Sequence, residues 1–396
     1  MLRQLPEGTD RDRHEVDLQM ALGWSLFATK GAGAAEREPI LMRATQLCEQ
    51  LGDKTKLMEA LLALGFFYEW RSAHGRVRKV AERVLALAEQ AHAPAMLARG
   101  HSQLAWALMF SGHLLQAREH FERALNLFEA EPPGKTGGLQ NYEMAGAADG
   151  LNAVQRWLGH PATALRKSRE LLDNVRRLSD PVLLASVLVR NGIGNMLMRF
   201  GDSPILAEQL RELVAIATEH GIAFRLSQAS FYRGWLMAAA GNFREGIAEM
   251  RQSMSETKTF GTGTLALAAI VLGQACNDHG LAQEGLEVVS EGLATTDANG
   301  FFAGELIRLR GQLLLLSDPP AAAEAERCFR TSLDISRGQS ARLCELRTTT
   351  SLARLLKSQG KTEEARRILS EIYGWFTEGF EFPDLKDAKA LLDELT

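Results

Sequence analysis

The stretch HSQLAWALMFSGHLLQAREHFERALNLFEAEPP, residues 101–133, decides how this chain folds. Apolar residues recur at helical spacing before and after Gly112, and Pro132 and Pro133 close the segment. Glycine is common just after a helix because it adopts the left-handed backbone conformation without a Cβ penalty. The stretch therefore predicts two helices that are joined by a turn at Gly112.

The same pattern recurs along the chain. An apolar helical stretch ends in glycine at Gly31, Gly75, Gly112, Gly159, Gly201, Gly241, Gly280 and Gly360. The long interval after Gly280 contains a different turn signal, formed by Asp318, Pro319 and Pro320. The spacing averages about 41 residues, which is in the range of helical-hairpin solenoids. No segment alternates apolar and polar residues with β-branched enrichment, so we predict no sheet.

Residues 101–133 also resemble the tetratricopeptide repeat (TPR). That motif has a small residue on its first helix, glycine near the turn, and alanine, an aromatic residue and alanine on its second helix. The matching residues here are Leu104, Ala105, Gly112, Ala117, Phe121 and Ala124. Small residues let two helices approach closely, and large ones fill the space between neighbouring repeats. Because Gly246, Gly285 and Gly292 stand where alanine is expected, we predict an irregular array.

The resemblance implies an all-α fold, a right-handed α–α superhelix (a TPR-like solenoid) of about nine helical hairpins. We expect residues 1–11 to be disordered or loosely packed and residues 12–382 to form the solenoid. Residues 383–396 are expected to form a C-terminal capping helix, because a terminal repeat has one face without a neighbour.

An aromatic cluster precedes that last helix. It consists of Tyr373, Trp375, Phe376, Phe380 and Phe382. The helix itself has apolar residues at helical spacing, including Leu385, Ala388 and Leu391. We interpret the cluster as the seat of the capping helix, with a partner-binding patch as the alternative.

A larger family resemblance covers almost the whole chain. The residues from Ala325 onward resemble the C-terminal TPR region of bacterial signalling proteins that combine an adenylate cyclase domain with a P-loop ATPase domain. Residues 11–31 and 229–254 resemble the start and the middle of that region. The ending IYGWFTEGF…DLKDAKALLDEL is its most specific element. The cyclase and ATPase modules are absent from this sequence, so we expect either a free-standing repeat protein or a fragment of a longer polypeptide.

Composition argues against several classes of protein. The chain is 46% hydrophobic and 24% charged, which is typical of a soluble globular protein. Its net charge of −4 argues against non-specific nucleic-acid binding, which requires a basic surface. The charged N-terminus lacks the apolar core of a signal peptide, and no apolar run is long enough to span a bilayer. We expect a cytoplasmic protein without a membrane or nucleic-acid partner.

Motifs for catalysis and cofactor binding are weak. PPGKTGG at residues 132–138 contains the end of a phosphate-binding loop, but Glu129 replaces the first glycine of GxxxxGK[ST]. His113 and His120 are seven residues apart and have no third metal ligand. The four cysteines form no CxxC pair. We predict no cofactor, no metal and no enzymatic activity.

The resemblance also implies where a partner binds, since the first helix of each hairpin lines the concave face of such solenoids. The corresponding residues here are Trp106, Arg156, Trp157, Asn191, Asn195, Arg199, Phe231, Trp235, Gln274, Asn277, Arg308, Gln312, Arg347 and Arg354. Asparagine can bond both backbone groups of an extended peptide, arginine can pair with carboxylates, and tryptophan often anchors interfaces. The alternative for the tryptophans is packing between helices, and for the arginines a solvated surface.

These observations favour a non-catalytic protein-interaction scaffold that binds a partner protein or peptide on its concave face. The alternative is a ligand-sensing regulatory arm of a signalling ATPase, an adenylate cyclase or a transcriptional regulator, which acts in cis or in trans. A pocket walled by Trp157, Phe231 and Trp235 would favour that alternative. An enzyme would require a cluster of titratable groups in one closed pocket.

Overall fold

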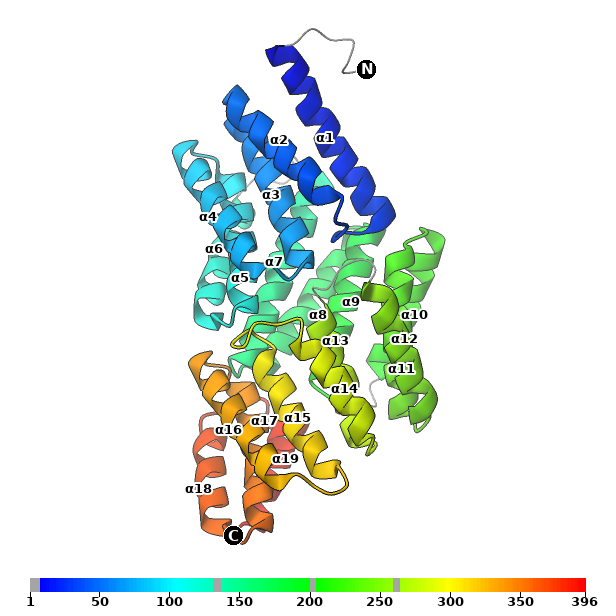
Figure 1. Cartoon of the computed structure of the whole chain (residues 1–396), viewed down its shortest axis with the longest axis vertical. Helices are drawn as coiled ribbons and strands as arrows, with labels where there is room; N and C mark the ends of the chain where they lie inside the picture. Colours follow the sequence, from blue (N-terminus) through cyan, green and yellow to red (C-terminus); the bar gives the residue numbers. More distant parts are fainter. Residues whose placement is uncertain (1–7, 131–136, 200–203, 259–263) are drawn as a thin grey trace. The chain divides into compact units, whose positions relative to one another are not determined.

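A computed structural model describes residues 8–130, 137–199, 204–258 and 264–396 of the protein (Figure 1). These ranges contain nineteen helices and no strand. The first ten are α1 (Thr9–Lys30), α2 (Arg37–Leu51), α3 (Lys54–Trp70), α4 (His74–Gln90), α5 (Pro94–Phe110), α6 (Leu114–Ala130), α7 (Gly137–Trp157), α8 (Pro161–Arg177), α9 (Pro181–Leu197) and α10 (Pro204–Glu219). The remainder are α11 (Ala223–Ala239), α12 (Phe243–Lys258), α13 (Leu265–Asp278), α14 (Ala282–Leu293), α15 (Ala303–Leu316), α16 (Ala322–Gly338), α17 (Arg342–Ser358), α18 (Thr362–Tyr373) and α19 (Pro383–Glu394).

Within the described ranges, successive helices form nine hairpins, and α19 follows the ninth. This arrangement confirms the predicted all-α solenoid of helical hairpins. Several helices begin with proline, because the first helical position does not need the missing backbone N–H. They are α5, α8, α9, α10 and α19. Helix α1 begins at Thr9, ahead of the predicted start of the solenoid at residue 12, and residues 1–7 lie outside the described ranges.

The turn glycines behave as predicted at most positions. Backbone φ is positive at Gly31, Gly112, Gly159, Gly241, Gly280 and Gly360. The prediction is wrong at Gly75, which lies inside the first turn of α4. There the chain turns through Ser72, whose φ of 54° supplies the left-handed residue in place of glycine. Gly201 lies outside the described residues, as does the Gly134–Thr136 part of PPGKTGG.

A departure from the TPR pattern has a packing reason. A Cβ atom on Gly234 of α11 would lie 2.6 Å from the carbonyl oxygen of Gly246 on α12. Likewise, a Cβ atom on Gly246 would lie 2.6 Å from the backbone nitrogen of Ala238. These two helices therefore approach more closely than alanine at either position permits.

The chain divides into two compact units. The first unit comprises residues 1–108, 119–147 and 258–264, and the second comprises residues 109–118, 148–257 and 265–396. The first unit has its own hydrophobic clusters, one of which is built around Leu47, Leu61 and Val84. None of the helices in the described ranges is both long and apolar enough to cross a membrane.

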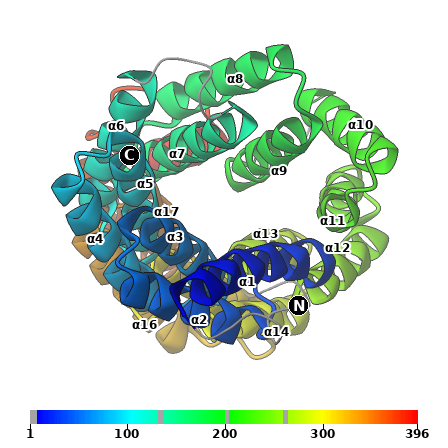
Figure 2. The ribbon, with the colours of Figure 1, turned by 90° about the horizontal axis from the view of Figure 1, so that it is seen from above.

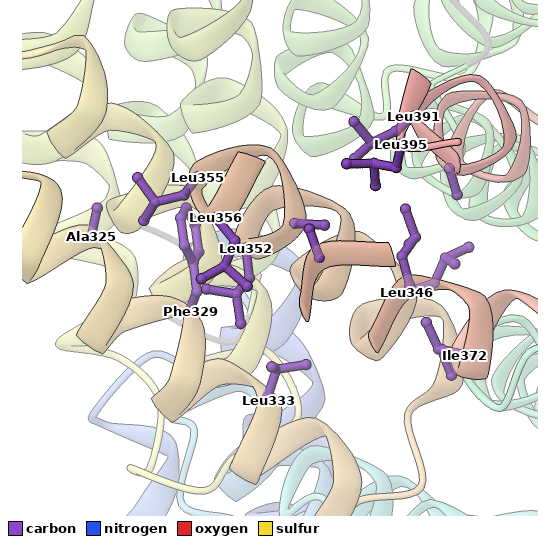
Figure 3. Packing of buried hydrophobic residues seen from close by; sticks show 14 of the residues in the cluster. Ala325, Phe329, Leu333, Leu346, Leu352, Leu355, Leu356, Ile372, Leu391 and Leu395 are labelled. Carbon is purple, nitrogen blue, oxygen red and sulfur yellow. The ribbon is translucent and has the colours of Figure 1, made fainter. Parts of the chain in front are cut away.

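The second unit has a core that includes the last helix. Leu385 and Leu391 of α19 belong to the same buried cluster as Phe329 and Leu346. Leu395, which follows the helix, is also part of this cluster (Figure 3). In the aromatic cluster, Phe376 and Phe382 are buried and Tyr373 packs against this core. By contrast, Trp375 and Phe380 remain 38% and 46% exposed.

Segments distant in sequence meet within the second unit. Glu378, in the loop before α19, accepts hydrogen bonds from the backbone N–H and the hydroxyl of Thr163 at 3.0 and 2.8 Å. Thr163 lies in the first turn of α8, where the helix dipole favours a carboxylate. Helix α9 lies inside α8 and α10 in this unit (Figure 2).

Candidate functional site

Two adjacent hollows of the second unit share a wall. Their volumes are about 170 and 140 Å³. Arg199, Gln274, Asp278 and Arg347 line both of them, and we call the two adjacent hollows together the groove. Apart from Arg199 at the end of α9 and the contributions of α19, the groove is built by the first helices of successive hairpins.

One end of the groove, which we call the apolar hollow, is lined mostly by hydrocarbon. Its apolar residues are Met196, Leu197, Trp235, Ala238, Ala239, Ile270, Val271 and Ala275. They come from α9, α11 and α13, and Trp235 is only partly buried. An apolar side chain seated here would contribute about 1.5–3 kcal/mol if it became fully buried.

The other end, which we call the polar hollow, is lined by side chains that form hydrogen bonds. They include Asn277, Arg308, Gln312, Thr350, Ser351, Arg354, Asp384 and Asp387, from α13, α15, α17 and α19. A groove with one apolar end and one polar end is suited to an amphipathic ligand.

Arg308 is fully engaged inside the protein. Its Nε and Nη2 atoms donate to the two carboxylate oxygens of Glu305 at 3.1 and 2.7 Å. Its Nη1 donates to Gln312 at 2.6 Å, and Nη2 also donates to Gln274 at 3.0 Å. Although burial acts to raise it, the charges of Arg308 and Arg347 lower the pKa of Glu305 to about 2. Arg308 therefore stabilises the wall of the polar hollow, and few of its N–H groups remain for a ligand.

Arg347 joins four helices at the shared wall. Its Nη1 donates to Glu305 of α15 at 3.1 Å. Its Nη2 donates to Asp384 of α19 at 2.7 Å and to the carbonyl oxygen of Leu197 of α9 at 2.5 Å. The guanidinium also lies over the ring of Trp157, 5.6 Å from its centroid. Burial acts to lower the pKa of Arg347, but the carboxylates of Asp384 and Glu305 raise it overall.

Arg199 occupies a left-handed backbone conformation, with φ of 59°. Its Nη1 donates to Asp387 at 3.2 Å and lies 3.9 Å from Asp384. A non-glycine residue in this conformation costs of order 1 kcal/mol, which the surrounding contacts must offset. In this conformation the Arg199 side chain lines both hollows.

Two charged side chains of the groove form no ion pair within the described residues. Among the residues that the structure describes, Arg354 has no hydrogen bond and no ion pair, and its side chain is exposed. Asp278 accepts hydrogen bonds only from the neutral amides of Gln274 and Asn277, at 2.7 and 3.4 Å. Both groups are available to a polar ligand.

The groove gathers eight of the residues predicted from the sequence, and that they bind a partner stays a prediction. They are Arg199, Trp235, Gln274, Asn277, Arg308, Gln312, Arg347 and Arg354. The other predicted residues of the second unit lie outside both hollows and are largely buried; they are Arg156, Trp157, Asn191, Asn195 and Phe231. Asn195 donates to Asn191, which in turn donates to the carbonyl oxygen of Ser168. Trp106 lies in the first unit, against Phe121.

The sequence analysis missed the acidic residues of the groove, namely Glu305, Asp278, Asp384 and Asp387. Glu305 had a local signal, because a position three residues before Arg308 shares its helical face. Asp384 and Asp387 had none, since they belong to the last helix and reach the groove only through the tertiary fold.

A histidine pair lies in the first unit. The Nδ1 atoms of His101 and His120 are 2.9 Å apart, so one imidazole donates to the other. Burial, together with the charges of His120 and Arg123, lowers the pKa of His101 to about 4. Within the described residues no three histidine, cysteine, aspartate or glutamate side chains form a group able to hold a metal ion.

Comparison with solved structures identifies proteins of similar fold. The crystal structure of a Rap protein complexed with competence and sporulation factor matches 97% of this chain and 99% of its own, with a TM-score of 0.57 and 11% identity. The Rap conjugation gene regulator of plasmid pLS20, in complex with the Phr* peptide, matches 96% of this chain and 95% of its own, with a TM-score of 0.52 and 12% identity. The chain has the fold of a TPR-type repeat protein. No family model and no curated protein matches its sequence.

Proposed function

We propose that this chain is a non-catalytic binding module that holds a short extended segment of a peptide or partner protein in the groove of the second unit. The observation that carries the proposal is the joining of an apolar hollow to a polar hollow through shared residues. The groove has an aromatic wall at Trp235 and two charged side chains, Arg354 and Asp278, that form no ion pair within the described residues.

The recognition chemistry follows from this arrangement. An apolar side chain of the ligand enters beside Trp235, and backbone groups of the segment meet the amides of Gln274 and Asn277. A carboxylate of the ligand can pair with Arg354, and a cation can pair with Asp278. The Rap structures support a peptide as occupant, because one is solved with competence and sporulation factor and the other with the Phr* peptide.

A random octapeptide display library, selected against the full chain, tests this proposal. We expect recovered peptides to share an apolar position, and resynthesised peptides to bind in fluorescence polarisation. Trp235→Ala should weaken their binding by tenfold or more, about 1.4 kcal/mol, because it removes the aromatic wall.

The matched control is Trp24→Ala, which removes a tryptophan that is 51% exposed in the first unit. It should leave the affinity unchanged. Recovery of no peptide above the background of the empty support, or equal losses for the two variants, would contradict the proposed site.

A regulatory arm is the second candidate, and one observation favours it. Arg347 lines the groove and also bonds Leu197 of α9 and Asp384 of α19, so a ligand that engages Arg347 alters the contacts of both helices. The resemblance to cyclase and ATPase signalling proteins implies that the regulated domain is a cyclase or an ATPase, either in the same polypeptide or in a separate one. Hydrogen exchange distinguishes the two candidates, since a regulatory ligand changes the protection of α19 amides and a scaffold ligand changes only groove amides.

A further inference from the structure

One buried guanidinium of the second unit has no partner. Arg156, in the last turn of α7, is 8% exposed. In the part of the chain that the structure describes, its side chain makes no hydrogen bond and no ion pair. The C-terminal end of a helix favours a cation, but this contribution is smaller than the cost of burying an unpaired charge. Buried arginines are otherwise almost always paired.

The carboxylates nearby are already engaged. Asp149, two turns earlier on α7, pairs with Arg190 of α9 at 3.1 Å. Burial raises the pKa of Asp149, although Arg190 and Arg156 act to lower it. Glu305 and Asp384 are both held by Arg347. Within the described ranges, no carboxylate therefore forms an ion pair with Arg156, although the charge of Asp149 acts on it.

Arg190 and Arg347, whose charges act on Asp149 and Arg156 respectively, also have unused buried N–H groups. The buried Nη2 of Arg190 and the buried Nε of Arg347 have no hydrogen-bond partner among the described residues, whereas the Nε of Arg190 lies 3.1 Å from Asp149. The pKa of Arg156 is lowered by burial, and the positive charge of Arg347 lowers it further, against the pull of Asp149. The cluster thus combines an excess positive charge with unused N–H groups, which together favour an anion.

Arg156 lies close to the groove. Its Nη2 is 2.6 Å from the position that a Cβ atom would take on Gly194 of α9. Gly194 precedes Leu197, which lines the apolar hollow, by less than one helical turn, or about 4.5 Å along the axis. Arg156 thus packs against α9 within one helical turn of a residue that lines the apolar hollow.

We propose that the peptide segment bound in the groove is acidic, and that a carboxylate of it pairs with Arg156. The inference rests on the proposed function and names the chemistry of its ligand. Arg190 supplies a second guanidinium for the same carboxylate, and Asp149 keeps that guanidinium in place.

The test uses the random octapeptide display library on the full chain, on Arg156→Met and on Arg156→Lys. Half of the library has a free C-terminus and half is amidated, which distinguishes a terminal carboxylate from an aspartate or glutamate side chain. We expect wild-type selections to be enriched in a carboxylate at one position. Resynthesised peptides in which that carboxylate is replaced by its amide should bind about tenfold more weakly.

The variants show whether Arg156 binds the carboxylate of the peptide. Arg156→Met should remove the acidic preference and keep the apolar one, whereas Arg156→Lys should keep part of the acidic preference. If wild-type selections share an apolar position but no carboxylate, or if Arg156→Met keeps the acidic preference, this inference is wrong while the proposed function stands. If no peptide is enriched, both fail.

Thermal unfolding without peptide supplies a readout that a purely structural arginine would not give. Because Arg156→Met removes an unpaired buried charge, we expect it to raise Tm by about 2 °C or more. A lower Tm, or a variant that does not fold, would show that Arg156 already has its partner within the chain and would overturn the inference.

Discussion

At the scale of single residues, the arginines of the groove divide by whether a partner within the chain already holds them. Arg308 and Arg347 are held by Glu305 and other acceptors, and they fix the wall of the groove. Arg354 and Arg156 form no hydrogen bond and no ion pair among the described residues, and these are the arginines that we propose for contact with a ligand. The same residue type thus stabilises the fold at some positions and is proposed for recognition at others.

Glu305 provides a pH-dependent test of the wall. Its pKa is about 2 in the folded chain, against 4.5 for a free glutamate. Because the folded pKa is the lower one, its stabilising contribution is complete above about pH 4.5 and is lost as the pH falls toward 2. The gap between the two values corresponds to about 3 kcal/mol.

We therefore expect Glu305→Gln to lower the free energy of unfolding in urea at pH 7, and the difference from wild type to shrink as the pH falls from 4.5 toward 2. Glu324→Gln is the control, since Glu324 forms a surface ion pair with Arg310 at 2.9 Å. Its effect should stay below about 1 kcal/mol. A wild-type difference for Glu305→Gln that does not change with pH would contradict the assigned role of this carboxylate.

At the scale of helices, close approach depends on residues without a side chain. Helices α11 and α12 meet at Gly234 and Gly246, where the backbones leave no room for a Cβ atom. Leu385 and Leu391 attach α19 to the core of the second unit in a different way, by filling space with large side chains. Both contacts position the groove, because α11 carries Trp235 and α19 carries Asp384.

Substitution of Gly246 tests the first kind of contact. Gly246→Ala should destabilise the chain by about 1–3 kcal/mol, because the new methyl group meets the backbone of Gly234 and Ala238. Gly146→Ala is the matched control, since Gly146 is also inside a helix and an added Cβ atom there has no neighbour within 4 Å. It should stabilise the chain by about 0.5–1 kcal/mol. Equal effects of the two changes in urea denaturation would refute the close-packing argument.

At the scale of the whole molecule, the second unit is held together by contacts between segments that are far apart in sequence. Arg347 bonds Leu197 across 150 residues, Arg199 bonds Asp387 across 188, and Glu378 bonds Thr163 across 215. An ideal solenoid has contacts only between neighbouring repeats. We therefore expect the second unit to unfold more cooperatively than a simple array would.

Truncation of the C-terminus tests this cooperativity. A chain that ends at Tyr373 lacks Glu378, Asp384 and Asp387, so Thr163 of α8 and Arg199 after α9 lose their long-range partners. The bond from Arg347 to Leu197 of α9 remains, but without its support from Asp384. We expect faster hydrogen exchange of the α9 amides in this chain than in the full one, with unchanged exchange in α3 of the first unit as the internal control. Unchanged protection of α9 would mean that the contacts made by the residues after Tyr373 do not stabilise it.

The sequence by itself determined the helices, their pairing and most of their turns. Apolar spacing and glycine position are properties of short segments, so the hairpin around Gly112 can be interpreted from its own residues. The prediction of turns from glycine was wrong where another residue type adopts the left-handed conformation. In the turn before α4 that residue is Ser72, not Gly75.

Only the tertiary structure decided which side chains remain available for binding. The sequence named Arg156, Arg308, Arg347 and Arg354 alike. Whether an arginine keeps a free guanidinium depends on carboxylates placed beside it by folding, such as Asp384 beside Arg347. Because ion pairing acts through space and helix periodicity acts along the chain, the sequence alone predicts the scaffold and the fold selects the recognition surface.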